Sequence, residues 1–117
     1  MVDIHSHISP HLDDGADGVE EALLMLNNAF ESGTKHIVLT PHYLNKAQCR
    51  FDVQKSDIIS AFEMLLEKKN EAKIPIEIYI GAEHFGVTDI GRIASENMLV
   101  PINNSRYVLV EFDFTDD

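Results

Sequence analysis

Two histidines near the start of the chain are spaced so that both side chains can act on one ligand. His5 and His7 stand two residues apart, at and just beyond the end of an expected first strand. Because side chains alternate along a strand, both imidazole rings are expected to point to the same side. Ordinary surface histidines can share this spacing, but two imidazoles on one face favour a shared metal ion or two bridged ions.

Further histidine and carboxylate side chains follow or end the later strand-like runs. His42 ends the segment Thr-Pro-His, Glu83 ends Gly-Ala-Glu, and Glu111 lies in the last apolar run. Asp13 and Asp14 lie in the loop after the first strand, and spacing alone does not separate them. Parallel α/β folds build their sites at the carboxyl ends of the strands, so these groups are expected to converge.

A mixed set of imidazoles and carboxylates is typical of sites for manganese, iron or zinc. Several such ligands in one place indicate a centre with more than one ion. Adjacent ions can hold a hydroxide nucleophile and clamp the oxygens of a phosphoryl group. They also reverse the local field, so that an acidic protein can bind an anionic substrate.

The remaining histidines and the single cysteine are not expected to join this site. His11 is read as a solvated loop residue, and His36 opens the second strand at the wrong end. His84 follows Glu83 directly, and neighbouring strand residues point to opposite faces. Cys49 lies in a polar stretch without a phosphate-cradling glycine loop, which favours an incidental thiol over a nucleophile.

Short β-rich runs alternate with longer helical runs, which is typical of an α/β fold with a parallel sheet. About four parallel strands are expected, at residues 2–5, 36–40, 76–80 and 107–112.

The helices expected between these strands have identifiable ends and buried faces. A first helix at 18–32 carries an apolar stripe and is expected to stop at Gly33. Asp52 is the expected N-cap of a second helix, and Thr88 the expected cap of a short helix at 89–95. The expected buried face of the second helix consists of Ile59, Phe62, Leu65 and Leu66.

Composition bounds the class of protein. The 117 residues are 44% apolar, enough for one small domain with a modest core. A formal net charge of -11 argues against non-specific nucleic-acid binding and against docking on anionic membranes. No apolar run approaches the ~18 residues of a membrane span, and the first residues do not form a secretory signal. A cytoplasmic location is therefore expected.

The opening MVDIHSHISPHLDDGADG resembles that of the protein-tyrosine phosphatases of the polymerase-and-histidinol-phosphatase (PHP) type, which are encoded with bacterial capsule and exopolysaccharide genes. The blocks HIVLTPH, GAE and SRYVLVEF resemble later family blocks in the same order. The resemblance covers essentially the whole chain. It rests on the ordered set, because other metallohydrolase barrels also begin with His-x-His.

The resemblance implies that residues 1–117 are a partial PHP domain, the N-terminal part of a distorted (β/α) barrel whose C-terminal half is absent. It implies up to three divalent ions, most often manganese, with iron or zinc as alternatives. The implied ligands are His5 and His7 at one metal, Glu83 bridging two metals, Glu111 at the second, and Asp14 and His42 at the third.

The function implied by the resemblance is hydrolysis of phosphotyrosine on a bacterial tyrosine kinase that regulates capsule or exopolysaccharide synthesis. The nucleophile would be metal-bound hydroxide rather than a side chain. Two alternatives remain at this point: another PHP-type phosphoesterase acting on a small monoester such as histidinol phosphate, or a truncated remnant without activity. A family C-terminal half would add ligands and phosphate-binding arginines, so impaired activity is expected. Self-association through an open sheet edge is also expected.

Overall fold

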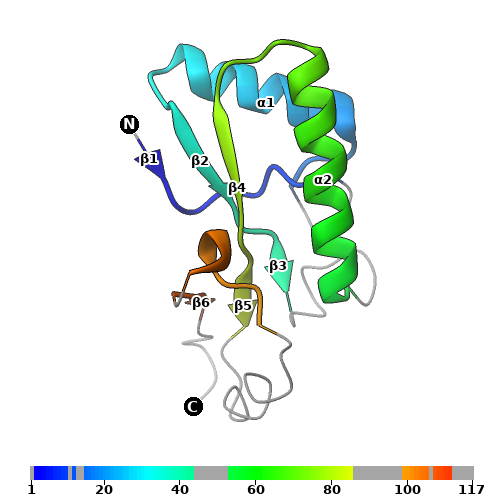
Figure 1. Ribbon diagram of the computed structural model, residues 1–117, viewed down its shortest axis with the longest axis vertical. Coiled ribbons are helices and arrows are strands. Elements are labelled where there is room, and N and C mark those ends of the chain that lie inside the picture. Colours follow the sequence, from blue (N-terminus) through cyan, green and yellow to red (C-terminus); the bar gives the residue numbers. More distant parts are fainter. Residues whose placement is uncertain are drawn as a thin grey trace.

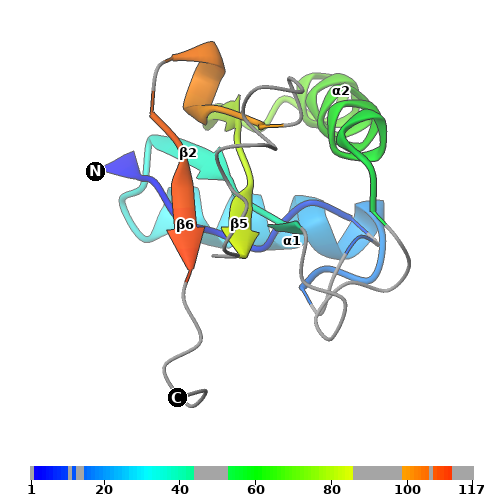
Figure 2. The ribbon, with the colours of Figure 1, turned by 90° about the horizontal axis from the view of Figure 1, so that it is seen from below.

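The computed structural model describes residues 2–10, 12, 15–43, 53–85, 99–105 and 107–111. Helices α1 (Val19–Glu31) and α2 (Lys55–Glu71) pack together beside the strands, and a 3-10 turn, η1 (Ile102–Asn104), lies against β4 and apart from both helices (Figures 1 and 2). The expected alternation of parallel strands with helices is therefore confirmed as a mixed α/β fold.

The strands form two short parallel sheets instead of one continuous sheet. The first has the order β1-β2-β4, and the second has the order β3-β5-β6. In chain order the strands are β1 (Val2–Asp3), β2 (His36–Leu39), β3 (His42–Tyr43), β4 (Glu77–Ile80), β5 (Glu83–Phe85) and β6 (Leu109–Glu111).

The second and third expected strands each continue, after a short interruption, as a further strand that was not predicted. β2 resumes as β3 after Thr40 and Pro41, and β4 resumes as β5 after Gly81 and Ala82. Pro41 was expected to end its strand, and it does interrupt the ladder, because proline has no N–H to donate. Its carbonyl nevertheless accepts a hydrogen bond from the Glu83 N–H at 2.9 Å, which keeps the two broken strands paired.

α1 follows the sequence prediction closely. Gly18 and Ser32 occupy its N-cap and C-cap positions. Gly33 follows with φ 105°, a left-handed conformation that glycine adopts without a Cβ clash. Ala22 and Leu26 are fully buried on the predicted apolar stripe, which packs on the sheet.

α2 differs from the prediction in its start and at one residue of its buried face, while Phe62, Leu65 and Leu66 pack on the core as predicted. Gln54, not Asp52, occupies the N-cap position, and its N–H donates to Asp57 Oδ2 at 2.7 Å. This contact is one half of a capping box. Ile59, predicted to be buried, is 36% exposed, whereas the adjacent Ile58 is buried. Two neighbouring isoleucines made the helical register ambiguous.

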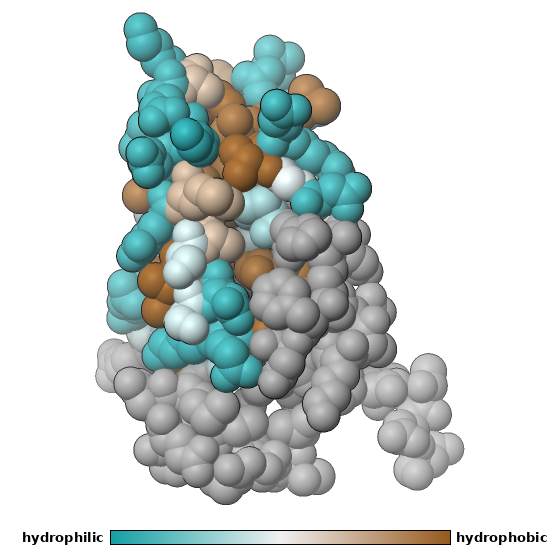
Figure 3. Space-filling model, turned by 90° about the vertical axis from the view of Figure 1, so that its right-hand side faces the viewer, coloured by the Kyte–Doolittle hydropathy of each residue, from teal (hydrophilic) through white to brown (hydrophobic). Residues whose placement is uncertain are grey.

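Two apolar clusters fill the interior. One lies between the helices and the β1-β2-β4 sheet, and the other lies where β3 meets α2. In the described part of the face shown in Figure 3, apolar surface emerges between hydrophilic side chains. α2 contributes exposed Ile59 and Met64 to the surface of the molecule. Neither described helix is long and apolar enough to cross a membrane.

The C-terminal segment is attached to β5 through a buried histidine. The His84 ring is 0% exposed, and its Nδ1–H donates to the Leu109 carbonyl at 2.9 Å. Its Nε2 accepts from the Val100 N–H at 3.0 Å. The two contacts define a neutral ring, and burial lowers the pKa of His84. Tyr43 packs edge-on against the ring, with centroids 5.4 Å apart, and burial raises the pKa of its hydroxyl.

Some predicted features are shorter or lie elsewhere. The first strand ends at Asp3 instead of His5, and the last begins at Leu109, while Tyr107 is 70% exposed. The helix expected at 89–95 and its cap Thr88 lie outside the described residues, as do Asp52 and Cys49. Among the described residues, the outer strands pair on one side only: β1 and β4 in the first sheet, and β3 and β6 in the second.

Replacing His84 by leucine should destabilise the fold. The substitution leaves the buried Val100 N–H and the partly buried Leu109 carbonyl without this partner, and an unpaired buried group costs about 1–3 kcal/mol. We expect the free energy of unfolding to fall by about 2 kcal/mol or more, measured by urea titration with circular dichroism. His36→Leu is the matched control, because the exposed His36 bonds to the Tyr79 hydroxyl at the protein surface and its loss should cost about 1 kcal/mol or less. Equal losses in the two variants would contradict this role of His84.

Acid should weaken the contribution of His84 and its bonds to Val100 and Leu109 to the free energy of unfolding. The pKa of His84 lies below its ordinary value of 6.5 in the folded chain, so below pH 6.5 the unfolded chain binds the proton more readily. The contribution of the neutral ring is therefore complete above pH 6.5 and is lost as the pH falls through the folded-state pKa. Urea titrations from pH 7 to pH 5 should show a decline that is smaller in His84→Leu. A decline of the same size in both proteins would show that other groups cause it.

Candidate metal centre

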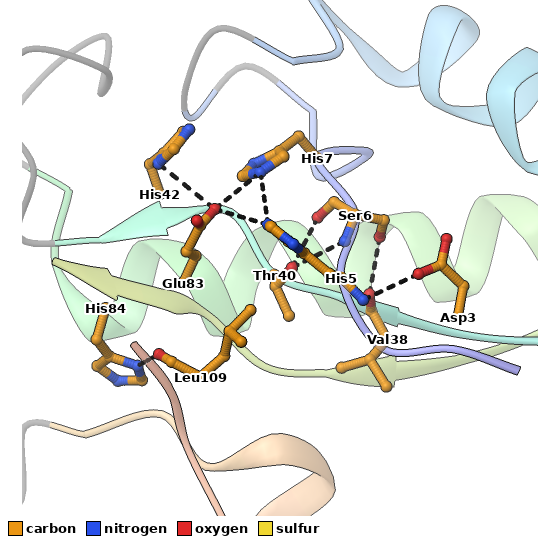
Figure 4. Close-up of polar contacts among 10 residues, drawn as sticks. All are labelled: Asp3, His5, Ser6, His7, Val38, Thr40, His42, Glu83, His84 and Leu109. Carbon is orange, nitrogen blue, oxygen red and sulfur yellow. Dashed lines mark hydrogen bonds and ion pairs between the residues drawn. The ribbon is translucent and has the colours of Figure 1, made fainter. Parts of the chain in front are cut away.

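The carboxyl-terminal ends of β1, β2 and β4 bring four of the predicted residues together. His5 and His7 lie in the segment after β1, His42 opens β3, and Glu83 opens β5 (Figure 4). His42 and Glu83 are partners in the parallel register of β3 and β5, so they lie side by side on one face. The segment after β1 passes beside them and adds its two rings.

Imidazole nitrogens converge on one carboxylate oxygen. Glu83 Oε2 lies 2.9 Å from His5 Nε2 and 2.9 Å from His7 Nε2. The two Nε2 atoms lie 3.2 Å from each other. His42 Nδ1 lies 3.7 Å from the same Oε2, and its ring stacks on that of His7 with centroids 4.3 Å apart. The four side chains thus face a common point.

Hydrogen bonding does not account for all three short contacts. A carboxylate oxygen only accepts, so His5 and His7 must each present an Nε2–H to bond with Glu83. The two N–H groups then face each other across 3.2 Å with no acceptor between them. If one ring instead carries its hydrogen on Nδ1, its Nε2 is an acceptor and faces the carboxylate oxygen, which is also an acceptor. One edge of the triangle is unsatisfied in either arrangement.

A divalent cation resolves this conflict, because it accepts lone pairs from all three atoms. Ligands at ~2.1 Å from one ion and 90–110° apart are separated by roughly 3.0–3.4 Å. The observed separations of 2.9, 2.9 and 3.2 Å are close to that range. His5, His7 and Glu83 also form a group whose candidate ligand atoms all lie within 4.8 Å of one another. The donor set therefore fits a metal ion.

Exposure gives the site a direction of approach. The Glu83 side chain is 9% exposed and that of His42 is 12% exposed, whereas His5 is 49% exposed. The carboxylate forms the floor of the site, and His5 forms its solvent-facing side. A ligand arriving from solvent would meet His5 and His7 before it reached Glu83.

The local backbone explains how His5 and His7 reach this place. The His5 N–H donates to Asp3 Oδ1 at 3.0 Å as the chain leaves β1. The Ala16 N–H donates to the His7 carbonyl at 3.3 Å, which closes the following loop. A Cβ on Gly15 would overlap that same carbonyl. The glycine of the Asp-Asp-Gly segment is thus required by close packing of the loop on His7.

The other predicted ligands are placed less fully. Asp14, together with Asp13, lies outside the described residues. In β6, Leu109 pairs with Glu83, and Glu111, two positions further on, pairs through its backbone with Phe85 of β5. The side chain of Glu111 lies outside the described part of the structure. These ligand assignments stay predictions.

The excluded histidines have separate positions. His36 lies at the opposite end of β2, where Nδ1 contacts the Tyr79 hydroxyl at 2.8 Å. His84 points away from Glu83 into the interior, as alternation predicted (Figure 4). His11 lies outside the described residues. Two further residues, Ser6 and Thr40, lie within the His-Ser-His and Thr-Pro-His segments and bond to each other beside the site, although no spacing in the sequence indicated them.

The fold matches a solved structure closely. The similar chain comes from the crystal structures of YwqE from Bacillus subtilis and CpsB from Streptococcus pneumoniae, described as metal-dependent tyrosine phosphatases. The TM-score is 0.88 at 28% identity, over 97% of this chain and 45% of that chain.

Curated relatives agree with the structural match. The chain is 36% identical over 115 residues to the CapC protein of Staphylococcus aureus, covering 96% of this chain and 43% of that protein. It is 31% identical over 112 residues to the tyrosine-protein phosphatase CpsB of Streptococcus pneumoniae, covering 96% of this chain and 45% of CpsB. The chain therefore spans less than half the length of these relatives.

The sequence also matches a family of capsular polysaccharide synthesis proteins, CpsB/CapC, over residues 1–117. The fold agrees with that match, since the similar solved chain comes from the same group of proteins. This chain belongs to the CpsB/CapC family.

Proposed function

We propose that the chain is the N-terminal part of a metal-dependent protein-tyrosine phosphatase. Its substrate would be phosphotyrosine on a bacterial tyrosine kinase that regulates capsule or exopolysaccharide synthesis. The observation that supports this proposal most directly is the convergence of His5 Nε2 and His7 Nε2 on Glu83 Oε2, each at 2.9 Å. The names of the relatives YwqE and CpsB supply the reaction class.

The described residues would hold the first metal ion and prepare a second position. His5 and His7 would bind through Nε2, and Glu83 would bind through the oxygen that both of them face. The stacking of His42 on His7 and its 3.7 Å distance to the same oxygen support a role at a neighbouring ion. Asp14 and Glu111 complete the proposed ligand set.

Divalent ions bound here would polarise phosphoryl oxygens and make water nucleophilic near neutral pH. The protein side chains would fix the positions of the ions, and the proposed nucleophile is activated water and not a side chain. The half-exposed His5 leaves the site open toward solvent, which suits a phosphate carried on a protein surface. Imidazole and carboxylate ligands together suit manganese, iron or zinc, and we propose Mn²⁺ among them because the family resemblance implies it.

The wider architecture is part of the proposal. Residues 1–117 would form a partial PHP domain whose two short parallel sheets belong to a distorted (β/α) barrel. The matched relatives are more than twice as long, so further ligands and phosphate-binding arginines would come from a region beyond this span. A cytoplasmic location stays a prediction from the sequence. Hydrolysis of a small phosphate monoester is the alternative that the activity test below separates.

Metal binding should depend on Glu83. Glu83→Gln keeps the shape of the side chain but removes its charge and replaces one ligand oxygen by an amide. We expect the affinity for Mn²⁺, measured by isothermal titration calorimetry, to fall by about 100-fold or more, since even residues that only support ligands contribute 10–100-fold. Glu77→Gln is the matched control, because Glu77 is an exposed carboxylate at the opposite end of β4. Unchanged binding in Glu83→Gln would refute the proposed site.

Activity should require the histidines and not the cysteine. The test uses the chain extended by a family C-terminal half, in Mn²⁺, with a phosphotyrosine peptide and histidinol phosphate as competing substrates. His5→Ala should reduce the rate at least 100-fold by weakening metal binding, whereas Cys49→Ser should leave it unchanged. Preference for histidinol phosphate would favour the alternative function. Comparable rates with and without the extension would show that the short chain completes its site in another way.

A further inference from the structure

A pair of hydroxyl side chains joins the backbone of the His-Ser-His segment to the end of β2. The Ser6 N–H donates to Thr40 Oγ1 at 2.8 Å, and the Thr40 hydroxyl donates to the Ser6 carbonyl at 3.1 Å. The Thr40 N–H donates to the same carbonyl at 2.8 Å. Ser6 Oγ donates to the Val38 carbonyl at 2.7 Å. Both polar backbone atoms of Ser6, the residue between the two candidate ligands, are therefore fixed (Figure 4).

The same threonine also contacts the segment that carries Glu83. A Cβ on Gly81 would lie 3.3 Å from Thr40 Cγ2 and 3.0 Å from Val38 Cγ1, so the two interrupted strands approach closely there. The Glu83 N–H then bonds to the carbonyl of Pro41, the residue after Thr40. Thr40 is 0% exposed, with its hydroxyl toward Ser6 and its methyl group toward Gly81.

We propose that Thr40 is a positioning residue that fixes the imidazoles of His5 and His7 relative to Glu83. The proposal rests on the metal site proposed above and assigns a residue that touches no metal. The segment after β1 has left the β1-β2 ladder, which pairs Val2 with His36 and Asp3 with Ile37. Past Asp3, the Ser6–Thr40 contacts take the place of the ladder.

The geometric demand on this contact is high. The three candidate ligand atoms lie within 2.9–3.2 Å of one another, so a shift of about 1 Å in the His5–His7 segment would remove one nitrogen from a shared ion. Outer groups that orient metal ligands typically contribute 10–100-fold to affinity. Thr40 is suited to this role because its hydroxyl both donates and accepts in one buried place.

Two substitutions separate the hydroxyl from the methyl group. Thr40→Val keeps the methyl contact with Gly81 and removes the hydroxyl, leaving the Ser6 N–H without its acceptor. Thr40→Ser keeps the hydroxyl and removes the methyl group. Both variants should lose some stability in urea titration, but only Thr40→Val should weaken Mn²⁺ binding, by about 10-fold or more in calorimetry. Circular dichroism establishes that each variant is folded at the titration temperature.

A metal-free readout keeps this proposal separate from the proposed function. In ¹⁵N-labelled chain without metal, Thr40→Val should shift the Nε2 resonances of His5 and His7, while Thr40→Ser should leave them near their wild-type positions. Wild-type chain that failed to bind Mn²⁺ would reject the metal site, and the resonances would still decide the role of Thr40. Unshifted resonances in Thr40→Val, or equal effects of the two variants on affinity or resonances, would overturn the positioning role.

Discussion

A carboxylate that is nearly removed from water needs compensating charge or hydrogen bonds, and Glu83 obtains them from imidazoles on two other segments. Desolvating an ionised carboxylate costs several kcal/mol unless neighbours replace the water. Neutral imidazoles offer only N–H dipoles. Because the two Nε2 atoms lie 3.2 Å apart, His5 and His7 cannot both donate an N–H to Glu83 without placing the two N–H groups against each other. A cation is the better partner, so the arrangement around Glu83 is one that metal binding would stabilise by mass action.

The strand interruptions leave the register between the two strands unchanged. Leu39 pairs with Ile80 before the break, and His42 pairs with Glu83 after it, at the same offset along the chain. Breaking both strands at the same level, after Leu39 and after Ile80, shifts pairing from one sheet to the next. Individual backbone bonds bridge the gap, including the one from the Glu83 N–H to the Pro41 carbonyl. Little hydrogen bonding is lost, and the pleat restarts with His42 and Glu83 adjacent.

Sequence patterns predicted those features that depend on residue type at regular spacing. Gly33 ended α1 where the apolar stripe ended, and the meeting of His5, His7 and Glu83 followed from parallel strands ending at one edge. The resumption of the strand at His42 was harder to foresee, because proline indicates a lost N–H but not whether the strand continues beyond it.

Other features depended on contacts that no spacing encodes. Only Ile59 on the predicted buried face of α2 was misjudged, because Ile58 and Ile59 are both apolar, and packing decides which one is buried. Ser6 and Thr40 were not predicted, because their hydroxyls bond to backbone carbonyls. Every residue has a backbone carbonyl, so such a bond cannot be inferred from the spacing of side chains. The register between distant segments therefore had to come from the structure.

The packing of Gly15 on the carbonyl of His7 affects how tolerance to substitution should be interpreted in this region. In a saturation scan scored by function, position 15 would reject every side chain as firmly as the ligands do. The cause would be volume, since even one methyl group displaces the loop from His7. Positions 13 and 14 directly precede Gly15. A substitution there that abolishes function would therefore have two explanations, a displaced backbone or a lost metal ligand. Only isosteric changes, such as Asp14→Asn, would distinguish a chemical requirement from a steric one.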